Sequence, residues 1–259
     1  MLAREYVARN MEAIMLEIKN LVKTYGGKIA LDKVELSIPR GEIVGLFGEN
    51  GAGKTTLMKC IFNFLHFSGE ITLDGEVINV NNIAKLSFAT SEHSFFPDIT
   101  AEAHRKFYSE HFPRFNDKRF NGLMEFFALP RHKILRSFST GQKNQFEVIL
   151  ALSQGADYIL MDEPFAGNDL FNREDFYKVL AGILEPNETV ILSTHLIEEV
   201  SGFIGRAVLL RRGKIIGDVT ADKLEEQGLT LTDYIKSTYN YRSDRVSKAL
   251  SDITGEEDI

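Results

Sequence analysis

Hydrophobic and polar residues alternate in two segments near the start of the chain. Apolar side chains recur in 16–22 until Gly26-Gly27 interrupts the pattern, and the alternation returns in 30–38 before a Pro-Arg-Gly sequence. Alternation with a period of two predicts half-exposed strands, and the glycines and proline predict turns. Residues 69–78 add strand-forming residues on both sides of an Asp-Gly pair, which is the sequence signal of a hairpin. The first part of the chain is therefore expected to include an antiparallel sheet.

Continuous apolar strands and helical segments alternate in the rest of the chain. A strand that is apolar throughout is typical of a sheet buried on both faces, and strand–helix alternation favours parallel order. We expect strands at 42–47, 158–162 and 189–193, helices at 56–65, 142–152 and 170–184, a short helix from Leu196, and a last hairpin within 208–216. The expected fold is α/β, with a mostly parallel central sheet, an antiparallel β-subdomain and a helical insert.

Phenylalanines alternate with charged residues and prolines after Phe88. This pattern predicts a helical insert over 98–138 with its own small aromatic core. Packing accounts for so many aromatic rings better than ligand stacking does.

Composition excludes several classes of function. The 30 Lys and Arg against 37 Asp and Glu give a net charge of −7, so no basic surface for nucleic acid is expected. No apolar run reaches the roughly 20 residues that span a bilayer, and residues 1–14 lack the features of a secretory signal, which together favour the cytoplasm. The single cysteine, Cys60, rules out an internal disulfide and is expected to be buried.

A glycine-rich loop follows the strand at 42–47. It reads Gly48-Glu49-Asn50-Gly51-Ala52-Gly53-Lys54-Thr55, with Thr56 next, and leads into a helical run. Such glycines let successive backbone N–H groups point into one concavity at the start of a helix, where a polyphosphate binds. Lys54 would neutralise the β- and γ-phosphates and the Thr55 hydroxyl would ligate Mg²⁺.

Two acidic residues follow the strand at 158–162. Asp162 ends the strand, so its carboxylate should emerge at the carboxyl edge of the sheet and hold the Mg²⁺. Glu163 comes next, before Pro164, and could polarise the attacking water as a general base.

With these motifs the chain resembles the nucleotide-binding subunit of ATP-binding-cassette (ABC) transporters, over nearly all of 16–239. The most specific segment is Phe138-Ser139-Thr140-Gly141-Gln142, which is similar to the signature loop of that family, with Thr140 in place of the usual second glycine. The resemblance implies that this loop caps the γ-phosphate bound to the other subunit of a dimer.

The resemblance assigns further residues one by one. Tyr25 matches the aromatic residue that stacks on adenine, although packing is the alternative for a lone tyrosine. His195 matches the switch histidine that touches the γ-phosphate and joins Glu163 and Lys54 as catalytic, while Asp169 matches the aspartate that communicates across the dimer. The glutamine that senses Mg²⁺ in the family is missing, and the nearest equivalents are Ser91 and Glu92.

The resemblance implies an ATP-binding and ATP-hydrolysing subunit with ATP and Mg²⁺ as cofactors. Its partners would be a second ATP-binding subunit, identical or related, and a separate transmembrane permease at the cytoplasmic face of the membrane, docked on the insert around 91–112. The compact cassette is similar to exporter ATPases for antimicrobial or amphipathic peptides. A soluble ATPase acting on ribosomes or nucleic acid is the alternative.

The same resemblance divides the chain into an N-terminal extension (1–14), an ABC nucleotide-binding domain (15–240, with its helical subdomain at about 91–146) and a polar tail (241–259).

Overall fold

An antiparallel sheet forms one side of the molecule. The computed structural model describes residues 15–164 and 170–239. The strands of this sheet lie in the order β2-β1-β4-β5. They are β1 (Met15–Tyr25), β2 (Lys28–Pro39), β4 (Ser68–Leu73) and β5 (Glu76–Val77), all paired antiparallel. The hairpin expected at 69–78 is confirmed, with its turn at Asp74-Gly75.

A second, central sheet has six strands in the order β10-β9-β3-β8-β7-β6. They are β3 (Ile43–Phe47), β6 (Leu86–Ala89), β7 (Tyr158–Asp162), β8 (Thr189–Thr194), β9 (Arg206–Arg211) and β10 (Lys214–Thr220). All neighbours are parallel except β9 and β10, which form the expected last hairpin. Strand β6 was not expected, because four residues are too few to show a period.

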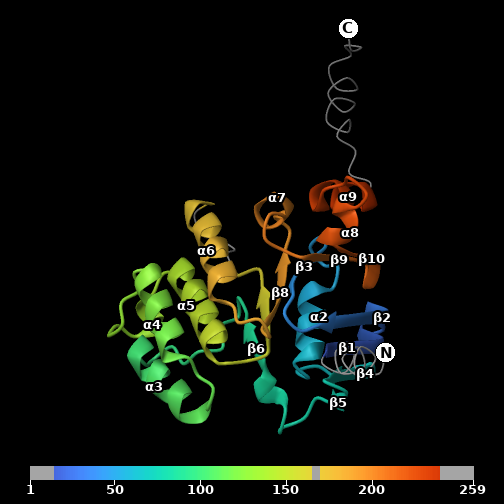
Figure 1. The fold of residues 1–259 in the computed structure, drawn as a ribbon. Helices are drawn as coiled ribbons and strands as arrows, with labels where there is room; N and C mark the ends of the chain where they lie inside the picture. Colours follow the sequence, from blue (N-terminus) through green and yellow to red (C-terminus); the bar gives the residue numbers. More distant parts are fainter. Residues whose placement is uncertain (1–14, 165–169, 240–259) are drawn as a thin grey trace, which may run out of the picture.

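Helices cover the central sheet and extend beyond it. They are α2 (Lys54–Ile61), α3 (Ala101–His111), α4 (Asp117–Phe126), α5 (Thr140–Ser153), α6 (Leu170–Ile183), α7 (Ile197–Val200), α8 (Ala221–Glu225) and α9 (Leu231–Thr238), with short 3₁₀ turns at Ile83–Lys85 and Leu135–Ser137. Figure 1 shows α3, α4 and α5 grouped on one side and α8 and α9 on the other. Helices α6 and α7, which follow the carboxyl ends of β7 and β8, lie at the top of this view. No helix of the described residues is long and apolar enough to cross a membrane.

The expectation that the helical insert has its own aromatic core is wrong. Phe95, Phe120 and Phe138 pack on Phe146 of α5, and all four belong to one apolar cluster with residues from the central sheet. The reason is that α5 is buried along nearly its whole length, so it has apolar partners on both sides. A second cluster lies between the antiparallel sheet, α2 and the other face of the central sheet, and it includes the buried Cys60.

A buried ion pair fixes the insert to the central sheet. Arg119 of α4 donates to both carboxylate oxygens of Glu188, at 2.8 and 2.9 Å, just before β8. The same guanidinium donates to the carbonyls of Leu152 and Ile183, near the ends of α5 and α6. One side chain thus joins three helices to the approach of a central strand.

Candidate nucleotide site

The glycine-rich loop connects β3 to α2. Gly51 and Gly53 have φ angles of +81° and +114°, which L-residues rarely adopt. A Cβ at Gly48 would lie 2.6 Å from the Leu210 carbonyl oxygen, so this position also requires glycine. Helix α2 has neither a side-chain cap nor an acidic residue in its first turn. Its first N–H groups and its dipole are therefore available to an anion.

Lys54 lies at the centre of the site. Its side chain is 7 % exposed, and its ammonium donates to the Gly48 carbonyl at 2.7 Å. The ammonium also lies 3.7 Å from the Glu163 carboxylate. The loop therefore holds the lysine charge against the acidic residue that follows β7.

Asp162 binds two hydroxyl groups. Its Oδ2 accepts from Thr55 Oγ1 at 2.6 Å and its Oδ1 accepts from Ser193 Oγ at 2.5 Å. The three residues come from α2, β7 and β8, and Asp162 is only 5 % exposed. The carboxyl edge of the parallel sheet thus brings together the two residues expected to hold a metal.

Glu163 and His195 lie against each other. Glu163 has a φ of +48°, an uncommon value for a non-glycine residue, which turns the chain at the end of β7. Its carboxylate lies 3.0 Å from His195 Nδ1. Because a carboxylate accepts hydrogen bonds, Nδ1 is the ring nitrogen that donates in this contact.

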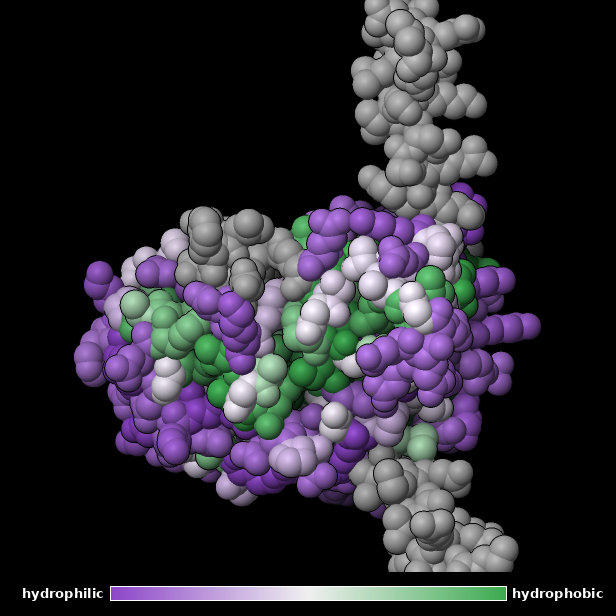
Figure 2. Space-filling model, turned by 45° about the horizontal axis from the view of Figure 1, so that its top comes forward, coloured by the Kyte–Doolittle hydropathy of each residue, from purple (hydrophilic) through white to green (hydrophobic). Residues whose placement is uncertain are grey.

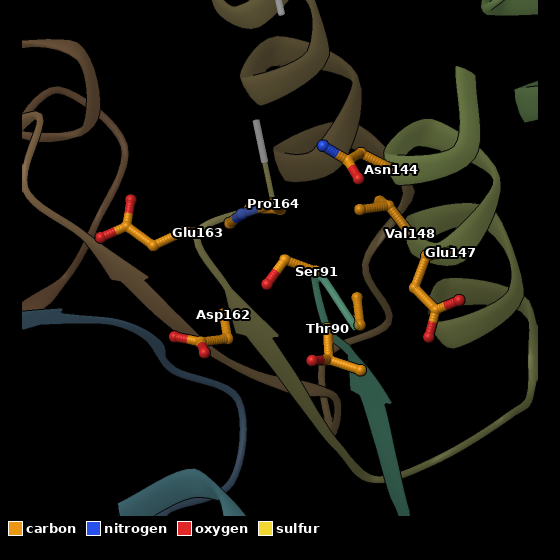
Figure 3. A pocket seen from close by; sticks show the side chains of 9 residues that line it. Thr90, Ser91, Asn144, Glu147, Val148, Asp162, Glu163 and Pro164 are labelled. Atoms are coloured by element: carbon orange, nitrogen blue, oxygen red, sulfur yellow. The ribbon is translucent and has the colours of Figure 1, made fainter. Parts of the chain in front are cut away.

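Of the two residues at the place of the missing glutamine, Ser91 faces this site. Ser91 lines a pocket with Asp162 and Glu163, and Figure 3 shows its side chain pointing towards Asp162. The Glu92 carboxylate instead pairs with Lys59 of α2 at 2.6 Å and is 70 % exposed. Glu92 therefore has another partner outside the pocket.

A buried glutamate on α5 borders the same pocket, and the sequence analysis missed it. Glu147 is 2 % exposed and accepts hydrogen bonds from Ser94 N and Ser94 Oγ. Burial raises the pKa of Glu147 to about 7, against the opposing effect of hydrogen bonds from Ser94 and from the backbone of Thr90 and Phe95. The sequence held a signal, since Glu147 is the one charged residue within the apolar run 146–152.

The signature residues begin α5. Ser139 caps the helix by accepting from Gln142 N at 3.2 Å, and Gln142 Oε1 accepts from Ser139 N at 3.0 Å. Thr140 and Gly141 occupy the first turn between them. This capping box keeps the turn rigid and exposed. The two pockets that reach Glu163 and His195 are lined by other residues.

Of the two remaining residues from the sequence analysis, the structure describes one, Tyr25. Tyr25 ends β1, is 48 % exposed, and has Lys23 Nζ at 4.8 Å from its ring centroid. Asp169 lies outside the described residues.

A second pocket, of about 220 Å³, lies between the glycine-rich loop and α9. Its lining includes Gly48, His195 and Ile235. Tyr239, just after α9, lies with its hydroxyl 3.0 Å from the Phe47 carbonyl and 3.1 Å from the Leu210 carbonyl. Helix α9 continues to Thr238, so Tyr239 directly after it supports the strand that leads into the glycine-rich loop.

Fold and site together define a P-loop nucleotide-binding protein with an added antiparallel sheet and helical insert. The family model for ABC transporters matches residues 31–166, which is more than half of the chain. The chain therefore belongs to the ABC transporter family and is an ATPase, the ATP-binding subunit of such a transporter.

Relatives found by sequence also carry names of ATP-binding proteins. The chain is 29 % identical over 217 residues to the ABC transporter ATP-binding protein YtrB of Bacillus subtilis, covering 82 % of this chain and 74 % of the relative. It is 29 % identical over 211 residues to the linearmycin resistance ATP-binding protein LnrL of the same organism, covering 78 % and 68 %.

The fold matches the solved ATP-binding subunit of an ABC transporter with a TM-score of 0.76, at 23 % identity, over 87 % of this chain and 98 % of the other. It also matches a dimeric ATP-binding cassette bound to ADP and Pi, with a TM-score of 0.70, at 23 % identity, over 80 % and 98 %. These likenesses confirm the expected ABC ATPase fold.

Proposed function

We propose that this ATPase hydrolyses ATP with Mg²⁺ in order to power export through a separate transmembrane subunit. The observation that carries the catalytic part is the meeting of Lys54, Asp162, Glu163 and His195 at the carboxyl edge of the central sheet. In this proposal the backbone N–H groups of residues 48–56 and the side chain of Lys54 surround the phosphates. Asn50, Ala52 and Thr56 are among the residues that contribute N–H groups.

Glu163 is the general base in this proposal. Its carboxylate takes the proton of a water whose oxygen attacks the γ-phosphorus, which releases ADP and phosphate. His195, held through Nδ1 by Glu163, presents Nε2 to the γ-phosphate. Tyr25 stacks on adenine, since its exposed ring favours stacking over the packing alternative.

The Thr55 hydroxyl and the Asp162 carboxylate fit a magnesium ion. Both are hard oxygen donors and lie 2.6 Å apart beside the glycine-rich loop. The described residues contain no cluster of three or more His, Cys, Asp or Glu side chains that could hold a metal. Few protein ligands suit Mg²⁺, which keeps waters and binds substrate phosphates. The ion would neutralise charge on the phosphate oxygens.

A second cassette completes the site. Ser139 and Thr140 of the signature loop are exposed and lie outside the lining of the pockets around Glu163 and His195, so they can cap a γ-phosphate bound to another subunit. Figure 2 shows apolar residues gathered in the middle of the face above the strand ends, as expected of a surface that a partner covers. The second cassette is another copy or a relative, and Asp169 communicates between the two.

The names of two relatives support export as the direction of transport. LnrL is named for linearmycin resistance, and a further relative, YbhF of Escherichia coli, is named a probable multidrug transporter protein. We place the chain at the cytoplasmic face of the membrane, with the permease docked around 91–112 and an amphipathic or antimicrobial peptide as cargo. We retain the division into 1–14, 15–240 and 241–259.

Substitution of Glu163 by glutamine tests the catalytic part. The amide keeps the shape of the side chain but takes up no proton, so turnover should fall at least about 100-fold while ATP still binds. Glu110→Gln, an exposed position on α3, is the matched control and should keep normal turnover. Near-normal ATPase activity of the Glu163→Gln protein would refute the assignment of Glu163 as the general base.

Purification of the tagged chain from its own host tests the transport part. A polytopic membrane protein should accompany it in mild detergent. Sedimentation with ribosomes instead would favour the alternative function.

A further inference from the structure

The loop that connects β6 to α3 is held mainly by side chains. Residues 90–96 contain no helix or strand, and His93 has a φ of +55°. The N–H groups of Ser94 and Phe96 donate to side chains of neighbouring helices rather than to a backbone ladder. These side chains therefore help to fix where the loop lies.

Glu147 of α5 makes the largest share of these contacts. Its two carboxylate oxygens accept from Ser94 N at 2.9 and 3.1 Å, and Oε1 also accepts from Ser94 Oγ at 2.6 Å. Figure 3 shows the carboxylate turned away from Asp162 and Glu163, so it binds the loop and not the reaction centre. A carboxylate can accept several hydrogen bonds at once, and bonds to a charged group are the stronger ones.

Two further contacts hold the loop on either side of Ser94. Asn144, one turn before Glu147 on α5, lies with its Oδ1 2.8 Å from His93 Nε2. His104 of α3 donates through Nδ1 to the Thr100 carbonyl, so its Nε2 accepts from Phe96 N at 3.0 Å. The loop is therefore attached to α5 through its first half and to α3 through its second.

We infer that Glu147 is a positioning residue that makes residues 90–96 follow helix α5. The inference rests on the proposed function, in which Ser139 at the start of α5 contacts nucleotide. Ser91 lies three residues before Ser94 and faces Asp162, while Phe96 lies two residues after it and is 52 % exposed. A movement of α5 is thus passed both to the nucleotide site and to an aromatic residue at the surface.

Hydrogen exchange of the full chain tests the inference. The measurements use the Glu163→Gln protein with and without ATP and Mg²⁺, and follow peptides covering 48–55, 90–96 and the first turn of α5. With Glu147 present, ATP should slow exchange in all three. Adding Glu147→Ala should speed basal exchange at 90–96 at least about tenfold, because the hydrogen bonds from Ser94 N and Ser94 Oγ are lost, and should abolish its response to ATP. The response at 48–55 should remain.

Conservative variants separate positioning from general damage. Glu147→Gln keeps an oxygen that accepts from Ser94 N, so it should restore most of the response at 90–96. Glu110→Ala on α3 is the control and should leave the three peptides unchanged. Ser94→Ala removes the hydroxyl donor from the other side and should weaken the response even where Glu147→Ala fails to fold.

Two results would overturn the inference. One is a response at 90–96 that persists in Glu147→Ala. The other is unchanged basal exchange at 90–96 in both Glu147→Ala and Ser94→Ala. A lack of ATP response at 48–55 would instead refute the proposed function. The role of Glu147 would then still be tested by comparing basal exchange at 90–96 with and without Glu147→Ala.

Discussion

Replacing Glu147 by glutamine should remove a pH dependence of folding stability that this one carboxyl group creates. Burial raises its pKa from the usual 4.5 to about 7 in the folded protein. The folded state therefore holds a proton that the unfolded state has already released between these values, so the free energy of unfolding falls as pH rises through this range. At about 1.4 kcal/mol per pH unit, the full cost of ionisation is about 3 kcal/mol.

Urea unfolding of the two proteins at about pH 5.5 and about pH 8.5 measures the effect, and linkage predicts that about 2 kcal/mol of the cost appears between these conditions. The glutamine side chain stays neutral at both pH values. The free energy of unfolding of Glu147→Gln, relative to that of the natural protein, should therefore rise by about 2 kcal/mol from about pH 5.5 to about pH 8.5. Tyr108 on α3 also interacts with Glu147. His104 on α3 and His93 on the loop contact its neighbours Phe146 and Asn144. Both proteins retain them, and the difference isolates the carboxyl group.

Glu125→Gln provides the control, because Glu125 is exposed on α4. Its stability difference from the natural protein should change by less than about 0.5 kcal/mol over the same range. An equally flat difference for Glu147→Gln would refute the reasoning, since it would mean that water reaches this carboxyl group.

Three more predictions concern contacts outside the loop. Tyr239→Phe removes the hydroxyl that contacts the carbonyl ending β3, and should lower unfolding free energy by about 1 kcal/mol and raise the KM for ATP up to about fivefold; an unchanged KM would argue against support of the glycine-rich loop. Arg119→Met leaves a buried carboxylate without its cation and should cost about 4 kcal/mol in urea unfolding, whereas the double variant with Glu188→Leu should cost less. Gly155→Ala should cost about 2 kcal/mol or more, because φ is +83° and a Cβ would collide with the Arg114 carbonyl; a neutral effect would contradict this strain.

The architecture could be predicted where the hydrophobic pattern is long or a turn is marked by glycine. The paired strands around Gly26-Gly27 and Asp74-Gly75 are such cases. The helix expected at 56–65 begins two residues earlier and ends at Ile61, because the apolar run continues into a cluster of Phe62, Phe64 and Phe88 rather than a further turn. Local pattern gives no information on such tertiary packing.

The candidate site divides in the same way. Lys54, Asp162 and Glu163 could be assigned because their chemistry lies within short motifs at the ends of strands. Tyr239 could not, since its partners lie 192 and 29 positions away in the chain. Glu147 lies between these cases, because its charge within an apolar helix indicated burial but not the loop that it binds.

Under the proposed function, Ser91 stands at the place of the family's glutamine, and this gives Glu147 its importance. A glutamine carries its amide on a side chain with three rotatable bonds, so it can reach a target from several backbone positions. Ser91 has one such bond before its oxygen, so the position of that oxygen follows the backbone closely. The Ser91 oxygen can then be placed accurately only if the backbone of the loop is held in place. Glu147, Asn144 and His104 are the side chains that hold this loop. We therefore expect that a longer side chain at position 91 would make Glu147 less necessary. In the hydrogen-exchange experiment, Ser91→Gln should leave the loop dependent on Glu147. In proteins that keep Glu163, Ser91→Gln should make ATPase activity less sensitive to Glu147→Ala.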